Sequence, residues 1–148
     1  MAATVARIMT PGPVMVDADT VVIECARLME INAIGALGVT RDGRLIGVLT
    51  DRDIVLRALA HGRDPSTTAA GEIASANPVT VPGEASVEDA EQKMRTYAVR
   101  RLFVVDGDDR PVGILSVDDL TALRYPQSVA AAQIREWNVM LSDQGYSD

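Results

Sequence analysis

Apolar positions in the first half of the chain predict a strand, a helix, two further strands and a second helix. A short apolar run at 14–16 is followed by a segment to about Asn32 whose apolar residues recur every three or four positions, the spacing of a buried helix face. The runs 34–39 and 45–49 are predicted strands, and the Asp-Gly pair between them supplies the positive-φ positions of a hairpin turn. A second helix is expected to follow Thr50.

The ends and the buried faces of these two helices follow from the same pattern. Asp19 or Thr20 is expected to cap the first helix, because either side chain can accept a hydrogen bond from a free backbone N–H. Gly62 is expected to end the second helix in a left-handed conformation. The predicted core-facing residues are Val22, Cys25, Ala26 and Met29 in the first helix and Ile54, Val55, Ala58 and Leu59 in the second.

The same order of elements then returns in the second half of the chain. Pro78 stands 65 positions after Pro13 (78 − 13 = 65) and is also followed by a short apolar strand. Ser86 is expected to cap the next helix, and 99–105 is the next predicted strand. An isolated unit of this kind leaves one sheet face and two helix faces uncovered, so two copies are expected to bury these faces against each other.

The repeat divides the chain into four parts. We place the first repeat at 5–62, a linker at 63–70, the second repeat at 71–124 and a helical tail at 125–148. The tail is expected to form one more amphipathic helix, whose stripe consists of Ala130, Ile134, Trp137 and Leu141.

One motif stands at corresponding places in both repeats. G-V-L-T-D-R-D-I at 47–54 is matched by G-I-L-S-V-D-D-L at 113–120, so a hydroxyl residue precedes an aspartate by three positions in each. This spacing is typical of a helix N-cap. A helix N-terminus also favours anions, and a carboxylate in its first turn can accept both hydroxyls of a ribose. Capping and ligand binding are compatible, and both interpretations stay open.

Two adjacent arginines distinguish the second repeat from the first. Arg100 and Arg101 begin a predicted strand, and the matching positions in the first repeat are Gly35 and Ala36. The pair is either an exposed strand edge or part of a phosphate site, for which the planar guanidinium is suited. The two repeats therefore cannot bind the same ligand in the same way.

Composition narrows the class of function. The chain has 148 residues, 47% of them hydrophobic, and a formal net charge of -7, which argues against a nucleic-acid-binding surface. No apolar run is long enough for a membrane span or a secretory signal, so we expect a cytoplasmic protein. Cys25 is interpreted as a core residue rather than a reactive thiol, and His61 as a surface residue, because no metal-ligand spacing surrounds it. No nucleophile–base pair indicates an enzyme.

Taken together, the repeat, its G-h-h-[ST]-x-x-D ends and the R-R-L-x-V-V-D strand resemble a tandem pair of CBS domains, often called a Bateman module. The first motif resembles that of small stand-alone bacterial CBS proteins, and the resemblance covers about residues 5–124. It implies an α+β fold of two β-α-β-β-α repeats packed about a pseudo-twofold axis, with two clefts and a homodimer. It also implies regulatory binding of AMP, ADP, ATP or S-adenosylmethionine, without a required cofactor or metal.

The resemblance also implies the residues of each cleft. The first cleft would contain Thr50, Asp53, Asn77, Pro82, Val99, Arg100 and Arg101. The second cleft would contain Ser116, Asp119, Gly12, Asp17, Gly35 and Ala36. The first is expected to take a phosphorylated ligand because it has the arginines, whereas Asp17 would repel a phosphate from the second. Gly38 and Phe103 stand where the family usually has proline.

Two functions follow from this resemblance. The first is a sensor that reports the adenine-nucleotide state to an unidentified protein effector. The alternative is a ligand-free structural or protein-interaction dimer whose clefts are vestigial. A melting temperature that rises with nucleotide favours the sensor.

Overall fold

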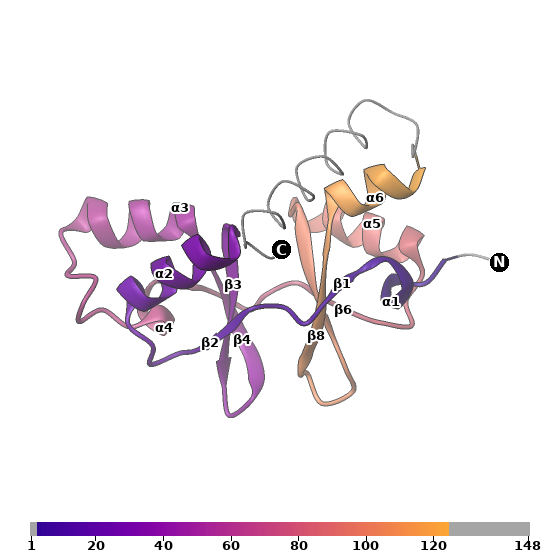
Figure 1. The fold of residues 1–148 in the computed structure, drawn as a ribbon. Helices are drawn as coiled ribbons and strands as arrows, with labels where there is room; N and C mark the ends of the chain where they lie inside the picture. The colour runs from indigo at the N-terminus through magenta and orange to yellow at the C-terminus, as the bar shows by residue number, and fades with distance from the viewer. Residues whose placement is uncertain (1–2, 125–148) are drawn as a thin grey trace. The chain divides into compact units, whose positions relative to one another are not determined.

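The computed structural model describes residues 3–124, and the predicted tail helix lies outside the described residues (Figure 1). The described chain forms two compact units. One unit is the continuous segment Val14–Pro78, and the other combines the chain up to Pro13 with the chain from Val79 onward. Each unit contains a four-stranded mixed sheet with helices, so the expected α+β class is confirmed.

The continuous unit contains the predicted strand, helix, strand, strand and helix in order, followed by two elements that were not predicted, α4 (Ala70–Ile73) and β5 (Ser75–Ala76). The predicted elements are β2 (Met15–Asp17), α2 (Val22–Asn32), β3 (Ala36–Arg41), β4 (Arg44–Thr50) and α3 (Asp51–Asp53). The helix that begins as α3 continues through a π-helical segment, Ile54–Ala58, and a final 3₁₀ turn, Leu59–His61. The sheet order is β2-β3-β4-β5, with β2 and β3 parallel and the other pairs antiparallel.

The second unit repeats this architecture. It contains α1 (Val5–Ile8), β1 (Thr10–Pro11), β6 (Thr80–Pro82), α5 (Val87–Tyr97), β7 (Arg101–Val105), β8 (Pro111–Ser116) and α6 (Val117–Arg124). Its sheet order is β1-β8-β7-β6, with β6 and β7 parallel. Figure 1 shows the indigo N-terminal segment running beside the orange β8.

The outer strand next to each motif strand comes from the segment just before the first predicted strand of the other repeat. β1 pairs with β8, and β5 pairs with β4. The first glycine of each motif lies at these pairings: a Cβ at Gly47 would lie 2.9 Å from the carbonyl oxygen of Ser75, and one at Gly113 would lie 3.1 Å from that of Thr10. The motif glycines therefore allow the outer strand to approach closely.

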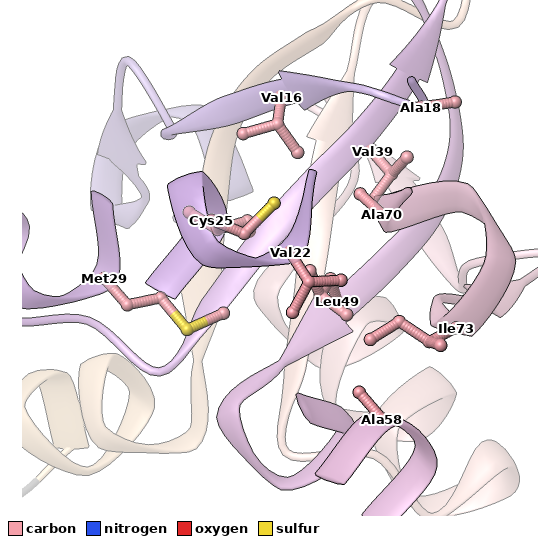
Figure 2. Packing of buried hydrophobic residues seen from close by; sticks show 11 residues of the cluster. Val16, Ala18, Val22, Cys25, Met29, Val39, Leu49, Ala58, Ala70 and Ile73 are labelled. Atoms are coloured by element: carbon pink, nitrogen blue, oxygen red, sulfur yellow. The ribbon is translucent and has the colours of Figure 1, made fainter. Parts of the chain in front are cut away.

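The core of the continuous unit lies between its helices and its sheet. Val22, Cys25 and Met29 of α2 point into this cluster together with Leu49 of β4 (Figure 2). The prediction was wrong for Ala26, which is exposed. It was also wrong for Val55 and Leu59, which are 53% and 56% exposed, whereas Ala58 is fully buried. The π-helical segment changes the angular spacing of this helix, so a stripe drawn for 3.6 residues per turn does not stay on one face.

The N-terminus of α2 is not capped as predicted. Neither Asp19 nor Thr20 accepts from it, and the side chain of Asp17 accepts from the Asp19 N–H instead. The N–H of Val22 donates to the carbonyl of Thr68 and that of Ile23 donates to the carbonyl of Pro65, at 2.9 and 3.0 Å. Carbonyls of the segment between the repeats therefore accept from the first N–H groups of α2, in place of the predicted side-chain cap.

The predicted β3–β4 turn, the helix end at Gly62 and the Ser86 cap are confirmed. Asp42 and Gly43 have positive φ in the β3–β4 turn, and Gly62 ends its helix at φ 68. The Ser86 hydroxyl accepts from the N–H of Asp89 at the start of α5. No helix within residues 3–124 has the length and apolar character needed to cross a membrane.

Cys25 is expected to resist alkylation while the protein is folded. Its side chain is fully buried, and burial raises the pKa of the thiol to about 11 from its ordinary 9.0. Iodoacetamide at pH 8 should therefore label it only after denaturation, as measured by intact mass. Because the unfolded thiol ionises first, its contribution to stability is complete below pH 9 and is lost as the pH rises toward 11. Labelling of the folded protein as fast as in urea would contradict this assignment.

Candidate functional site

The first candidate carboxylate lies at the start of the helix that follows β4. The Thr50 hydroxyl accepts from the N–H of Asp53 at 3.1 Å, and Asp53 Oδ2 accepts from the N–H of Thr50 at 2.9 Å. These reciprocal bonds form a capping box. Capping uses one carboxylate oxygen, so the other stays available for a further interaction.

The second unit repeats this arrangement. The Ser116 hydroxyl accepts from the N–H of Asp119 at 3.2 Å, and Asp119 Oδ2 accepts from the N–H of Ser116 at 2.8 Å. The predicted caps are therefore present in both repeats. In each case the aspartate is held in the first turn of a helix, where the helix dipole favours a negative charge.

Each unit places the start of its second predicted strand, β3 or β7, beside its capping box. Ala36 is the register partner of Thr50, and Arg101 is the register partner of Ser116. The preceding carbonyls make matching hydrogen bonds: Gly35 accepts from the N–H of Asp51 at 3.0 Å, and Arg100 accepts from that of Val117 at 2.9 Å. At one end of each sheet, the first residues of a strand therefore lie beside the capped N-terminus of a helix.

The two sheet ends differ in charge. In the continuous unit, a Cβ at Gly35 would lie 3.0 Å from Asp51 Oδ2, so a carboxylate covers this strand start. The corresponding residues of the other unit are Arg100 and Val117. Arg100 and Arg101 are exposed, and no ion pair involves either of them within residues 3–124. The sheet end with Arg100 and Arg101 therefore favours an anion, whereas the sheet end with Asp51 repels one.

Two predicted residues lie away from these sheet ends. Asp17 is the register partner of Thr40, and Pro82 that of Val105. Each is therefore displaced along the neighbouring strand by four residues from Ala36 or Arg101, about 13 Å. The structure does not bring Asp17 to Ala36, or Pro82 to the arginines, within either unit.

The remaining predicted residues lie at turns and strand starts. Gly12 and Asn77 are corresponding residues with positive φ, 64 and 55, just before β2 and β6. Val99 is half-buried and packs against the core of the second unit. Asp53 and the arginine pair belong to different units, so their participation in one site stays a prediction.

Sequence reasoning missed one neighbour of Asp53. Arg57 Nε lies 3.7 Å from Asp53 Oδ1, and Arg57 Nη1 donates to the carbonyl of Ile73 at 3.2 Å. The four-residue spacing between the carboxylate and the arginine was a signal for this pair. The contact with α4 could not be read from local sequence, because sixteen residues separate Arg57 from Ile73.

The two other kinds of site that residues 3–124 could offer are a metal site and a surface groove. No group of three or more histidine, cysteine or acidic side chains there is arranged to hold a metal ion. Residues of α5 and α6 line a groove, and two of them form an ion pair, with Arg124 Nη2 2.6 Å from Glu91 Oε2. The groove contains no residue of either capping box.

Comparison with known proteins identifies relatives over most of the chain. The family model described as "CBS domain" matches residues 5–59 and 70–125. The CBS domain-containing protein YhcV of Bacillus subtilis is 39% identical over 126 residues, which cover 85% of this chain and 89% of that protein.

Two solved structures with similar folds contain adenosyl compounds. The CBS domain pair of protein MJ0100, in complex with 5'-methylthioadenosine and S-adenosyl-L-methionine, superposes with a TM-score of 0.76 at 26% identity, covering 86% of this chain and all of that chain (100%). The CBS domain protein PAE2072 of Pyrobaculum aerophilum, complexed with AMP, gives a TM-score of 0.71 at 30% identity, covering 80% and 90%.

Proposed function

Because this chain belongs to the CBS-domain family and contains a tandem pair of CBS repeats, we propose that it is a regulatory module that binds an adenine nucleotide. The observation that carries the proposal is the occurrence of exposed Arg100 and Arg101 beside one capping box and of an oriented Asp53 in the other. Solved CBS pairs complexed with AMP and with S-adenosyl-L-methionine support this ligand class.

The proposed site assigns a separate part of the nucleotide to each group. Asp53 Oδ1 accepts hydrogen bonds from the ribose hydroxyls, while Thr50 keeps the carboxylate in place. Arg100 and Arg101 bind the phosphate, for which a guanidinium fork supplies parallel donors. Asn77 and Val99 are assigned to the base and the edge of the site by the family resemblance alone. Pro82, displaced by about 13 Å from Arg101, would lie at the outer edge.

The corresponding second site is proposed to prefer a ligand without phosphate. It would combine Ser116 and Asp119 with Gly12, Gly35 and Ala36, and Asp17, displaced by about 13 Å from Ala36, would lie at its outer edge. The Asp51 carboxylate beside Gly35 opposes an anion at this strand start. A neutral or cationic adenosyl compound fits this charge better than AMP.

The proposed output is an interaction with another protein. We propose a homodimer that carries out no chemical step and transmits the nucleotide state to a protein effector.

Asp53→Asn is expected to weaken nucleotide binding. Asparagine keeps an oxygen that can accept from the N–H of Thr50, so the cap is retained while the charge is lost. Millimolar AMP should raise the melting temperature of the unsubstituted protein, and the increase should be clearly smaller in this variant. Loss of one charge-assisted hydrogen bond lowers affinity by about tenfold or more.

Asp119→Asn is the matched control, because it makes the same substitution in the other capping box. It should leave the AMP response intact. Equal melting temperatures of the unsubstituted protein with and without AMP, ATP and S-adenosylmethionine would refute the proposed function.

A ligand-free interaction dimer is the second candidate. Exposed apolar side chains on the helices of the continuous unit favour it: Ile31, Val55, Leu56 and Leu59 are 44–61% exposed. In that case a protein complex should form equally well with and without AMP and should survive Asp53→Asn.

A further inference from the structure

We propose that Arg57 is a positioning residue that orients the Asp53 carboxylate for the ribose hydroxyls. This inference rests on the proposed function, because it concerns the same ligand site. All groups that carry it lie in the continuous unit: Thr50, Asp53, Arg57 and the carbonyl of Ile73.

The two oxygens of Asp53 have different surroundings. Oδ2 accepts the N–H of Thr50 at 2.9 Å, a normal hydrogen bond. Oδ1 lies 3.7 Å from Arg57 Nε, which is an ion-pair distance beyond hydrogen-bonding range. Arg57 therefore attracts Oδ1 without donating a hydrogen bond to it. Within this unit, Oδ1 can still accept hydrogen bonds from the ribose hydroxyls of a ligand.

Arg57 is itself held in place by a second contact. Its Nη1 donates to the Ile73 carbonyl at 3.2 Å, at the C-terminal end of α4. A guanidinium has its donors in one rigid plane, so anchoring Nη1 restricts the position of Nε. The Asp53 side chain is only 14% exposed, which further limits its rotation. The carboxylate plane is thus fixed from two sides.

The backbone around Arg57 is also unusual. Arg57 lies in the π-helical segment Ile54–Ala58, whose wider turn changes the direction of side chains relative to an α-helix. The corresponding helix in the other unit, α6, is a regular α-helix, and Leu123 occupies the matching position (57 + 66 = 123). Only one of the two capping boxes therefore has this arginine.

The test measures the affinities of AMP and 2'-deoxy-AMP by calorimetry in the unsubstituted full chain and in Arg57→Ala. AMP affinity should fall by about tenfold in the variant, as expected when a charge-assisted hydrogen bond is misaligned. Affinity for 2'-deoxy-AMP should fall less, so the preference for AMP should shrink. An exclusively structural role would weaken both nucleotides equally, and that result would overturn the inference.

Two further variants complete the test. Arg52→Ala removes the same charge from the first turn of the same helix, where the side chain is exposed and forms no ion pair with Asp53, and should leave both affinities unchanged. Arg57→Lys keeps a positive charge beside Oδ1 and should recover most of the preference. A lysine variant no better than alanine would contradict the role of the ion pair. If Arg57→Ala does not fold, the preference of Arg57→Lys for AMP over 2'-deoxy-AMP is compared with that of the unsubstituted protein, and its loss in Arg57→Lys would contradict the inference.

The possible failures are distinguishable. Unchanged AMP affinity in Arg57→Ala would overturn the role of Arg57 and leave the proposed function intact. Absence of AMP binding in the unsubstituted protein would refute AMP as the ligand of this site, and the inference with it.

Discussion

Val5→Asp is expected to destabilise the unit that contains β6–β8, although Val5 lies near the opposite end of the sequence. The Val5 side chain is fully buried and belongs to the same cluster as Val81, Leu102 and Leu115. An unpaired carboxylate in this cluster has to be protonated or exposed to water, and either outcome costs about 4 kcal/mol. The free energy of unfolding, measured by urea titration, should fall by this amount.

Hydrogen exchange can locate the effect of Val5→Asp. Protection should be lost first in peptides from 79–124, where the partners of Val5 lie, and later in peptides from 14–78. Ala6→Asp is the matched control, because the neighbouring Ala6 is exposed. A Val5→Asp protein as stable as the Ala6→Asp protein would show that the N-terminal helix does not contribute to this core.

Gly47→Val is expected to separate β5 from β4. A Cβ at position 47 would lie 2.9 Å from the Ser75 carbonyl oxygen, and this backbone atom cannot rotate away as a side chain can. Valine adds two methyl groups at the same point. Overpacking of this kind costs about 1–3 kcal/mol, which should appear in the free energy of unfolding measured by urea titration.

Gly107→Val is the control for this substitution. A Cβ at Gly107 would have no heavy atom within 4 Å, and the residue does not have a positive φ, so valine should be accepted there with little change in stability. Equal effects of the two substitutions would show that the close approach of β5 is not what requires glycine at position 47.

The elements that the sequence predicted well are those determined by neighbouring residues. The turn at Asp42-Gly43 needs positive φ, and only a few residue types adopt it without strain. The caps at Thr50 and Ser116 depend on a side chain and an N–H three positions away. Such short-range signals, repeated 66 positions apart (116 − 50 = 66), were sufficient to predict two similar α+β units.

The features that the sequence did not predict depend on distant partners. The first turn of α2 donates to carbonyls of Pro65 and Thr68, so its local candidates Asp19 and Thr20 were not needed as caps. β1 and β5 have two residues each, too few to show an alternating pattern. Their assignment as strands depends on pairing with β8 and β4, which the local sequence does not indicate.

For the candidate site, sequence reasoning found both capping boxes but not all their surroundings. The Thr50–Asp53 and Ser116–Asp119 pairs are formed as predicted. The approach of Arg57 depends on a π-helical segment and a carbonyl of α4, and neither has a local signature. The position of Pro82 beside Val105 follows from strand register, which the apolar pattern alone does not determine.

The pairing of β1 with β8 has a consequence for the order in which the chain can fold during synthesis. Thr10 and Ile114 are register partners separated by 104 positions (114 − 10 = 104), whereas every pairing in the other sheet lies within Val14–Pro78. The continuous unit can form once the ribosome has released its last strand. β1 must wait, unpaired, until β8 emerges, so this strand is among the last elements to reach its native contacts although it is made before the whole continuous unit.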